Sequence, residues 1–286
     1  MNVWVEAARP RTLPAAVAPV LLGTAASGRF LAWRFSAALV VSVGLQVAVN
    51  YANDYFDGVR GIDTHDRAGP RRATASGLVT PEAMKRAIAV ALLVAASAGL
   101  ALTLEVGPEL LLVGAASVAA ALAYSGGPRP YASAGLGELF VFVFFGLVAT
   151  IGAAYVQVER LPAAAIAAAV PAGLLATAIL VVNNLRDIPT DERSGKRTLA
   201  VRLGEAGTRR LFTALIGSTA VATIPLALTA GAGPPALIGF LPLVAAPRIV
   251  SAVKRERGAG LIPCLGQTAQ LLLAFAAVWS VILWTY

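Results

Sequence analysis

Residues 162–191 read PAAAIAAAVPAGLLATAILVVNNLRDIPTD, and this stretch decides the fold class of the chain. Its apolar part is long enough to cross the hydrocarbon core of a bilayer as a helix, which takes about 20 residues. The run ends at Asn183 and Asn184, and the carboxylates Asp187 and Asp191 follow directly. Charge therefore appears only where such a helix would leave the membrane.

The composition of the whole chain agrees with that interpretation. Hydrophobic residues make up 58% of the 286 residues and charged residues only 13%, whereas a soluble domain has about 25% charged residues. The mean hydropathy is +0.75. These values exclude a soluble globule and a disordered chain, and the single cysteine, Cys264, excludes an internal disulfide. We expect an all-α polytopic membrane protein whose surrounding partner is a lipid bilayer.

Windows of about 20 apolar residues predict nine transmembrane helices in a single domain, 1–286. With the N-terminus in the cytoplasm, 20 of the 23 Lys and Arg residues fall on the inner side, as the positive-inside rule requires. The basic net charge, +8, thus reports topology and not a nucleic-acid partner. We expect a plasma-membrane protein with cytoplasmic cap loops. The expected spans are roughly 13–30, 35–53, 86–104, 109–125, 136–156, 162–184, 210–230, 234–252 and 264–285.

All the aspartates of the chain gather in two clusters, each at the cytoplasmic end of an expected span. If the second span continues as a helix through Asp57, then Asn50, Asn53 and Asp54 share one face with it. Asn183, Asp187 and Asp191 recur every four residues and also share a face. The six aspartates are Asp54, Asp57, Asp63, Asp66, Asp187 and Asp191.

Clustered carboxylates repel one another unless cations lie between them, and hard oxygen ligands of this kind suit Mg²⁺ shared with a phosphorylated substrate. No Cys/His cluster is present to favour zinc. A phosphate-binding loop ending at Lys196 is excluded because Thr190 stands where its first glycine is required. The predicted Mg²⁺ ligands are Asp54, Asp57, Asp187 and Asp191, and the predicted diphosphate-binding residues are Asn53, Arg60, Lys196 and Arg197.

Two Asp-rich motifs after the second and sixth of nine spans resemble those of the UbiA superfamily of intramembrane prenyltransferases. The usual first motif of that family is Asn-Asp-x₂-Asp-x₃-Asp, and this chain departs from it. Its third acidic position falls on Gly61, and the next carboxylates are Asp63 and Asp66. The longer gap, in NDYFDGVRGID (53–63), is similar to the branch of the family that prenylates 1,4-dihydroxy-2-naphthoate.

Further segments along nearly the whole chain carry the same resemblance. They are RPRTLP at 9–14, RPY at 129–131, GLGE at 135–138, NNLRDIPTD at 183–191 and GKRTL at 195–199. The segment 183–191 with its continuation is the most specific match.

This resemblance implies two substrates, a polyprenyl diphosphate and a bicyclic aromatic acid, and Mg²⁺ as cofactor. The prenyl group would replace the carboxylate of dihydroxynaphthoate and give demethylmenaquinol. Prenyl chain length and oligomeric state stay open. Candidate catalytic or acceptor-binding residues are Asp63, Asp66, Tyr124, Arg129, Glu138 and Asn184.

Three other functions remain as alternatives. One is a UbiA-type enzyme with another acceptor, such as 4-hydroxybenzoate, haem, a chlorophyll precursor or a glycerol phosphate lipid. A CDP-alcohol phosphotransferase is disfavoured because its acidic residues all lie within one region. A cation-coupled transporter is disfavoured because its charges belong near the span centres.

Overall fold

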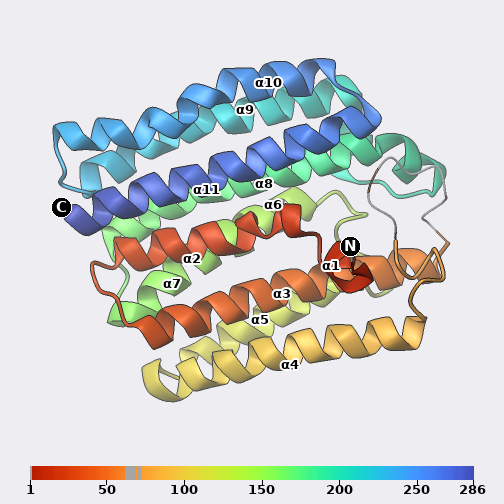
Figure 1. The fold of residues 1–286 in the computed structure, drawn as a ribbon, viewed down its shortest axis with the longest axis horizontal. Helices are drawn as coiled ribbons and strands as arrows, with labels where there is room; N and C mark the ends of the chain where they lie inside the picture. Colours follow the sequence, from red (N-terminus) through yellow and green to blue (C-terminus); the bar gives the residue numbers. More distant parts are fainter. Residues whose placement is uncertain (1, 62–68, 70–71) are drawn as a thin grey trace.

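The computed structural model describes residues 2–61, 69 and 72–286, and within these residues the chain is helical, with no strand. The long helices lie side by side and form one bundle (Figure 1). The α-helices are α1 (Val3–Ala7), α2 (Pro14–Ala26), α3 (Ala32–Val59), α4 (Pro81–Val106), α5 (Glu109–Ala123), α6 (Gly137–Val141), α7 (Ala149–Val158), α8 (Ala163–Arg193), α9 (Leu199–Thr229), α10 (Ala246–Arg255) and α11 (Leu261–Thr285). Other helical segments are η1 (Pro10–Thr12), the π-helical η2 (Phe142–Val148), η3 (Pro234–Ala245) and η4 (Gly258–Gly260).

Among the described residues, seven helical stretches are long and apolar enough to cross a membrane. Each coincides with one of the nine expected spans. The other two expected spans fall on α2 and α5, which have 13 and 15 residues and are shorter than the about 20 residues that a full crossing takes. The membrane-helical fold is therefore confirmed, whereas nine complete crossings and the cytoplasmic N-terminus stay predictions.

Helix α8 forms the centre of the bundle. In its most apolar window 72% of the residues are buried, compared with 17–44% in the other candidate spans. It packs against α9, α11, α2 and η2. Small residues allow the close approach to η2, because a Cβ on Gly146 would lie 2.5 Å from the Cα of Gly173. This contact fixes η2 directly against α8.

Both aspartate motifs lie on helices that continue beyond the expected end of the span. Helix α3 runs to Val59 and α8 to Arg193, although the apolar windows ended at 53 and 184. Asn50, Asn53, Asp54 and Asp57 are all buried, so the predicted polar face of α3 is confirmed as an inward-facing one. Helices α3 and α8 end at the same end of the bundle (Figure 1).

Candidate active site

A cavity of about 290 Å³ lies between α2, α3, α5, η2 and α8. At the end of the bundle where α3 and α8 terminate, its wall is polar. Toward the middle of the membrane-spanning helices its wall becomes apolar, with residues such as Leu45, Phe144 and Ile179. The polar end brings together residues of both aspartate clusters, which are Asn53, Asp57, Asn183, Asn184, Asp187, Asp191 and Lys196.

Asp57 is the centre of this polar end. Its side chain is almost completely buried, and its Oδ2 accepts a hydrogen bond from Lys196 Nζ at 2.9 Å and from Arg72 Nη2 at 3.0 Å. Asp57 Oδ1 is buried and has no hydrogen-bond partner within the described part of the chain. A buried carboxylate oxygen without a partner is costly, so this oxygen is well suited to accept a ligand that enters the cavity.

Lys196 reaches Asp57 because of the way α8 ends. Gly195 adopts a φ of 75°, in the left-handed region that favours glycine, and the Lys196 N–H donates to Asp191 O at 2.9 Å. The turn reverses the chain directly after α8. The Lys196 side chain therefore points back toward the cavity, which it lines.

The second cluster is held by its own arginine. Arg186 donates through Nε and Nη2 to the two oxygens of Asp187, both at 2.7 Å, and through Nη2 to Asn183 Oδ1 at 2.9 Å. Asp191 Oδ2 lies 3.5 Å from Thr198 Oγ1. A two-point Arg–carboxylate contact fixes the carboxylate plane, so Asp187 is held rigidly at the cavity wall.

Asp54 occupies a different position from the other predicted metal ligands. Its Oδ2 accepts from the backbone N–H of Ala73 and its Oδ1 from that of Thr74, both at 2.8 Å. It does not belong to the described residues that line the cavity. In the structure Asp54 anchors the segment that leads into α4, and a direct role as metal ligand stays a prediction.

The remaining predicted residues divide by position. Tyr124 and Asn184 line the cavity, and Asn184 Nδ2 donates to Glu138 Oε1 at 2.9 Å. Arg60 instead donates to Ser125 O at 2.9 Å and to Gly127 O at 2.7 Å. The exposed side chains of Arg129 and Arg197 lie outside the set of described residues that form the cavity wall. Asp63 and Asp66 lie outside the described residues.

Several cavity residues were not predicted from the sequence. Thr12 and Gln46 form a polar patch inside the bundle, and the isolated Gln46 within the apolar run 35–53 was a usable signal for it. Arg9 and Arg72 also line the polar end. Nothing local distinguishes Arg72 from other cations of the same polar loop.

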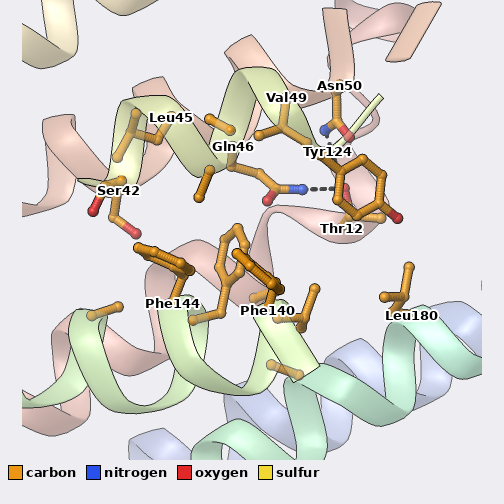
Figure 2. A pocket seen from close by; sticks show the side chains of 18 of the residues that line it. Thr12, Ser42, Leu45, Gln46, Val49, Asn50, Tyr124, Phe140, Phe144 and Leu180 are labelled. Carbon is orange, nitrogen blue, oxygen red and sulfur yellow. Dashed lines mark hydrogen bonds between the residues drawn. The ribbon is translucent and has the colours of Figure 1, made fainter. Parts of the chain in front are cut away.

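One wall of the cavity is a row of aromatic rings. Phe140 is stacked between Tyr131, at a centroid distance of 4.0 Å, and Phe144, at 6.0 Å. Gln46 and Asn50 on α3 lie across the cavity from Phe140 and Phe144 (Figure 2). Burial raises the pKa of the Tyr131 phenol, which therefore stays protonated and donates to Ala120 O at 2.9 Å.

Residues 13–261 match the family model of the UbiA prenyltransferase family. The chain belongs to this family. It is 47% identical to the 1,4-dihydroxy-2-naphthoate octaprenyltransferase of Mycobacterium tuberculosis over 277 residues, which cover 96% of this chain and 94% of the relative. It is 42% identical to the enzyme of the same name from Escherichia coli, over 87% of this chain and 83% of the relative.

Solved UbiA structures share the fold. The apo structure of a UbiA homolog from Aeropyrum pernix K1 superimposes with a TM-score of 0.70 at 17% identity, over 94% of this chain and 96% of that one. A UbiA homolog from Archaeoglobus fulgidus bound to DMAPP and Mg²⁺ gives a TM-score of 0.67 at 16% identity, over 98% of this chain and 100% of that one.

The donor set of this UbiA family member fits Mg²⁺. Among the described residues, no three metal-ligating side chains converge on one point. A Mg²⁺ ion shared with a diphosphate needs only one or two protein carboxylates and takes its other oxygens from phosphate and water. Such carboxylates line the cavity at Asp57, whose Oδ1 has no partner in the described part of the chain, and at Asp187 and Asp191.

Proposed function

We propose that this protein transfers a polyprenyl group from its diphosphate to 1,4-dihydroxy-2-naphthoate, in a reaction that needs Mg²⁺. One observation carries the proposal: a single cavity joins a carboxylate- and cation-lined end to a long apolar wall within the bundle. Relatives at 42–47% identity over most of both chains are named for this reaction. Together these support the acceptor that the motif pattern of the sequence predicts.

The polar end has the chemistry that a diphosphate requires. Asp57, Asp187 and Asp191 would hold Mg²⁺, which when bound supplies positive charge to the phosphate oxygens. Lys196 and Arg72 add cationic donors directly beside Asp57. Because negative charge grows on the diphosphate as it leaves, fixed cations here stabilise the transition state more than the ground state.

The apolar part of the cavity would receive the prenyl chain. Side chains from α3, α5 and η2 line it, and the apolar wall continues as far as Val156 on α7. A chain that lies here is shielded from water while the allylic C–O bond breaks and the pyrophosphate takes the bonding electron pair. The aromatic rings of Tyr124 and Phe144, which line the cavity, would supply π electron density that stabilises the allylic cation left behind.

The acceptor completes the reaction. The electron-rich ring attacks the allylic carbon at the position that bears the carboxylate, and a new C–C bond forms. The carboxylate then leaves as CO₂, and its bonding pair returns to the ring. One prenyl diphosphate and one dihydroxynaphthoate thus give one prenylated hydroquinone, one CO₂ and one pyrophosphate.

The site is proposed to face the cytoplasm in the plasma membrane. The distribution of Lys and Arg supports this orientation, since the topology expected from the sequence puts 20 of 23 on the cytoplasmic side, where the second and sixth expected spans end. Dihydroxynaphthoate and the diphosphate head group are both water-soluble anions, which would enter at that end.

An acceptor competition tests the proposal. Purified protein in lipid is given a polyprenyl diphosphate with equal amounts of 1,4-dihydroxy-2-naphthoate and 4-hydroxybenzoate, with Mg²⁺ or with a chelator. We expect prenylated naphthohydroquinone to dominate and to disappear reversibly on chelation. Preferential consumption of 4-hydroxybenzoate, or turnover that persists without divalent ions, would contradict it.

A further inference from the structure

A hydrogen-bonded patch on the cavity wall lies deeper than the aspartates. The Thr12 hydroxyl donates to Arg9 O at 2.9 Å. It accepts from Gln46 Nε2 at 3.1 Å and from Asn50 Nδ2 at 3.4 Å, and Asn50 Nδ2 also donates to Ala8 O at 2.8 Å. These contacts connect α3 to the segment that precedes α2 (Figure 2).

This network fixes the orientation of both side-chain amides. A hydroxyl has one proton to donate, and the proton of Thr12 is directed to Arg9 O. Gln46 and Asn50 must therefore present their N–H groups to Thr12 and not their oxygens. Their carbonyl oxygens, Gln46 Oε1 and Asn50 Oδ1, have no hydrogen-bond partner in the described ranges 2–61, 69 and 72–286, and both residues line the cavity.

The two amides lie one turn apart on α3. Side chains at i and i+4 of a helix are separated by about 5–6 Å, which is comparable to the distance between para substituents of one aromatic ring. The wall across the cavity is the row of Tyr131, Phe140 and Phe144, and because these rings stack on one another a flat acceptor ring can pack against them edge-to-face. The cavity thus offers two acceptors along one edge and an aromatic wall.

We propose that Gln46 and Asn50 form the acceptor subsite and select a ring with two para hydroxyl groups. This inference rests on the proposed function and names its specificity-determining residues. Asn50 lies seven residues before Asp57, or roughly 10 Å along the helix axis, whereas Gln46 is one turn deeper. The carbon to be prenylated must face the diphosphate end, so the edge that carries the 1-hydroxyl meets Asn50 and the 4-hydroxyl donates to Gln46 Oε1.

The same arrangement rejects 4-hydroxybenzoate. That acid carries a carboxylate para to its hydroxyl, and in this subsite the carboxylate oxygens would meet the carbonyl oxygen of Gln46. Neither the carboxylate nor the Gln46 carbonyl oxygen carries a proton, so no hydrogen bond can form between them. Removing the charged carboxylate from water without giving it a partner is unfavourable. Selection between the two aromatic acids therefore follows from the amide orientation that Thr12 imposes.

The first test pairs a variant with a substrate analogue. Gln46→Met keeps the side-chain length and removes the amide, and the analogue, 1-hydroxy-2-naphthoate, lacks the 4-hydroxyl. We expect the variant to raise the KM for the dihydroxynaphthoate acceptor about tenfold, which corresponds to one lost hydrogen bond of about 1.4 kcal/mol. The inhibition constant for the analogue and the KM for the prenyl diphosphate should stay within about twofold of wild type, a smaller change than the loss of a hydrogen bond produces.

The control is Gln270→Met, the same substitution at an exposed position of α11, which should change none of these constants. If Gln46→Met raised the KM for dihydroxynaphthoate and the inhibition constant for 1-hydroxy-2-naphthoate by the same factor, the role of Gln46 would be purely structural. That result would overturn the inference. An increase in the KM for the prenyl diphosphate comparable to that for the acceptor would overturn it as well. Wild-type protein that does not prenylate dihydroxynaphthoate at all would instead refute the proposed function.

A second variant is expected to bind 4-hydroxybenzoate more tightly than wild type, a change that misfolding would not produce. Thr12→Val removes the hydroxyl that holds the Gln46 amide, so Gln46 can turn its N–H group toward the cavity, whereas Asn50 stays oriented by Ala8 O. We expect 4-hydroxybenzoate to inhibit this variant about tenfold more strongly than wild type, because its carboxylate now meets donors. An inhibition constant for 4-hydroxybenzoate that is unchanged or higher would overturn the inference, whatever Gln46→Met shows.

Discussion

The ammonium group of Lys196 lies 2.9 Å from Oδ2 of Asp57, although the two residues are 139 positions apart in the chain. This ion pair joins the end of α3 to the turn after α8, and it is buried on the Asp57 side. The two aspartate motifs are therefore parts of one site. The same pair places a cation beside the carboxylate whose other oxygen, Oδ1, has no hydrogen-bond partner among the residues that the structure describes.

Asp57 is the carboxylate on which the site depends most. We expect Asp57→Asn to lower kcat by about 100-fold or more, because a neutral amide binds Mg²⁺ more weakly than a carboxylate and does not balance Arg72 and Lys196. Prenyl transfer by purified protein in lipid checks this. Glu192→Gln, an exposed carboxylate on α8, serves as the matched control and should retain full activity.

Lys196 should matter for the diphosphate more than for the acceptor. Lys196→Gln is expected to raise the KM for the prenyl diphosphate by about tenfold or more, since one charge-assisted contact is lost. The KM for the acceptor should change little. The control is Lys254→Gln, which removes an exposed cation of α10. If steady-state kinetics showed the same increase in the KM for the prenyl diphosphate in both lysine variants, the effect would come from net charge alone.

Asp54 should affect stability more than the chemical step. Asp54→Ala leaves the backbone N–H groups of Ala73 and Thr74 without their partner, and we expect a loss of about 2 kcal/mol or more. Asp54→Asn keeps one acceptor oxygen and should lose about half as much. Thermal unfolding and protease cleavage between α3 and α4 measure the effect. Equal stability of wild type and Asp54→Ala would disprove the anchoring role.

The contact between Gly146 and Gly173 predicts a packing defect. A Cβ on residue 146 would lie 2.5 Å from Gly173 Cα and 3.0 Å from its N. Because backbone atoms cannot turn aside, Gly146→Ala should destabilise the protein by about 1–3 kcal/mol and displace the Phe144 wall. A Cβ on Gly217 meets no atom within 4 Å, so Gly217→Ala should leave the thermal midpoint unchanged or slightly higher.

Much of the fold could be predicted from hydropathy and spacing. The burial of Asn50, Asn53, Asp54 and Asp57 on one face of α3 followed from their i, i+3, i+4, i+7 spacing. The apolar windows end at 53 and 184, before α3 and α8 do, because a hydropathy window stops at the first charges. A hydropathy window cannot show that a polar turn of helix continues inside a protein when neighbouring segments supply hydrogen-bond partners for its side chains.

The contacts that shape the site depend on tertiary packing and could not be predicted from local pattern. The distance of Lys196 from Asp57 depends on the turn at Gly195 and on how α3 meets α8. In the same way, Asp54 differs from Asp57 only because the segment at Ala73 folds over it. Spacing alone treats these two aspartates as equivalent metal ligands.

The fate of the acceptor carboxylate tests the central claim most directly. Purified protein in lipid is given a polyprenyl diphosphate, Mg²⁺ and 1,4-dihydroxy-2-naphthoate labelled at the carboxyl carbon, and labelled CO₂ and prenylated product are measured together. The proposed reaction predicts one labelled CO₂ for each prenylated ring, and both products formed at least about 100-fold more slowly by Asp57→Asn. Prenylated product that retains the label, or no product from the wild-type protein, would contradict it.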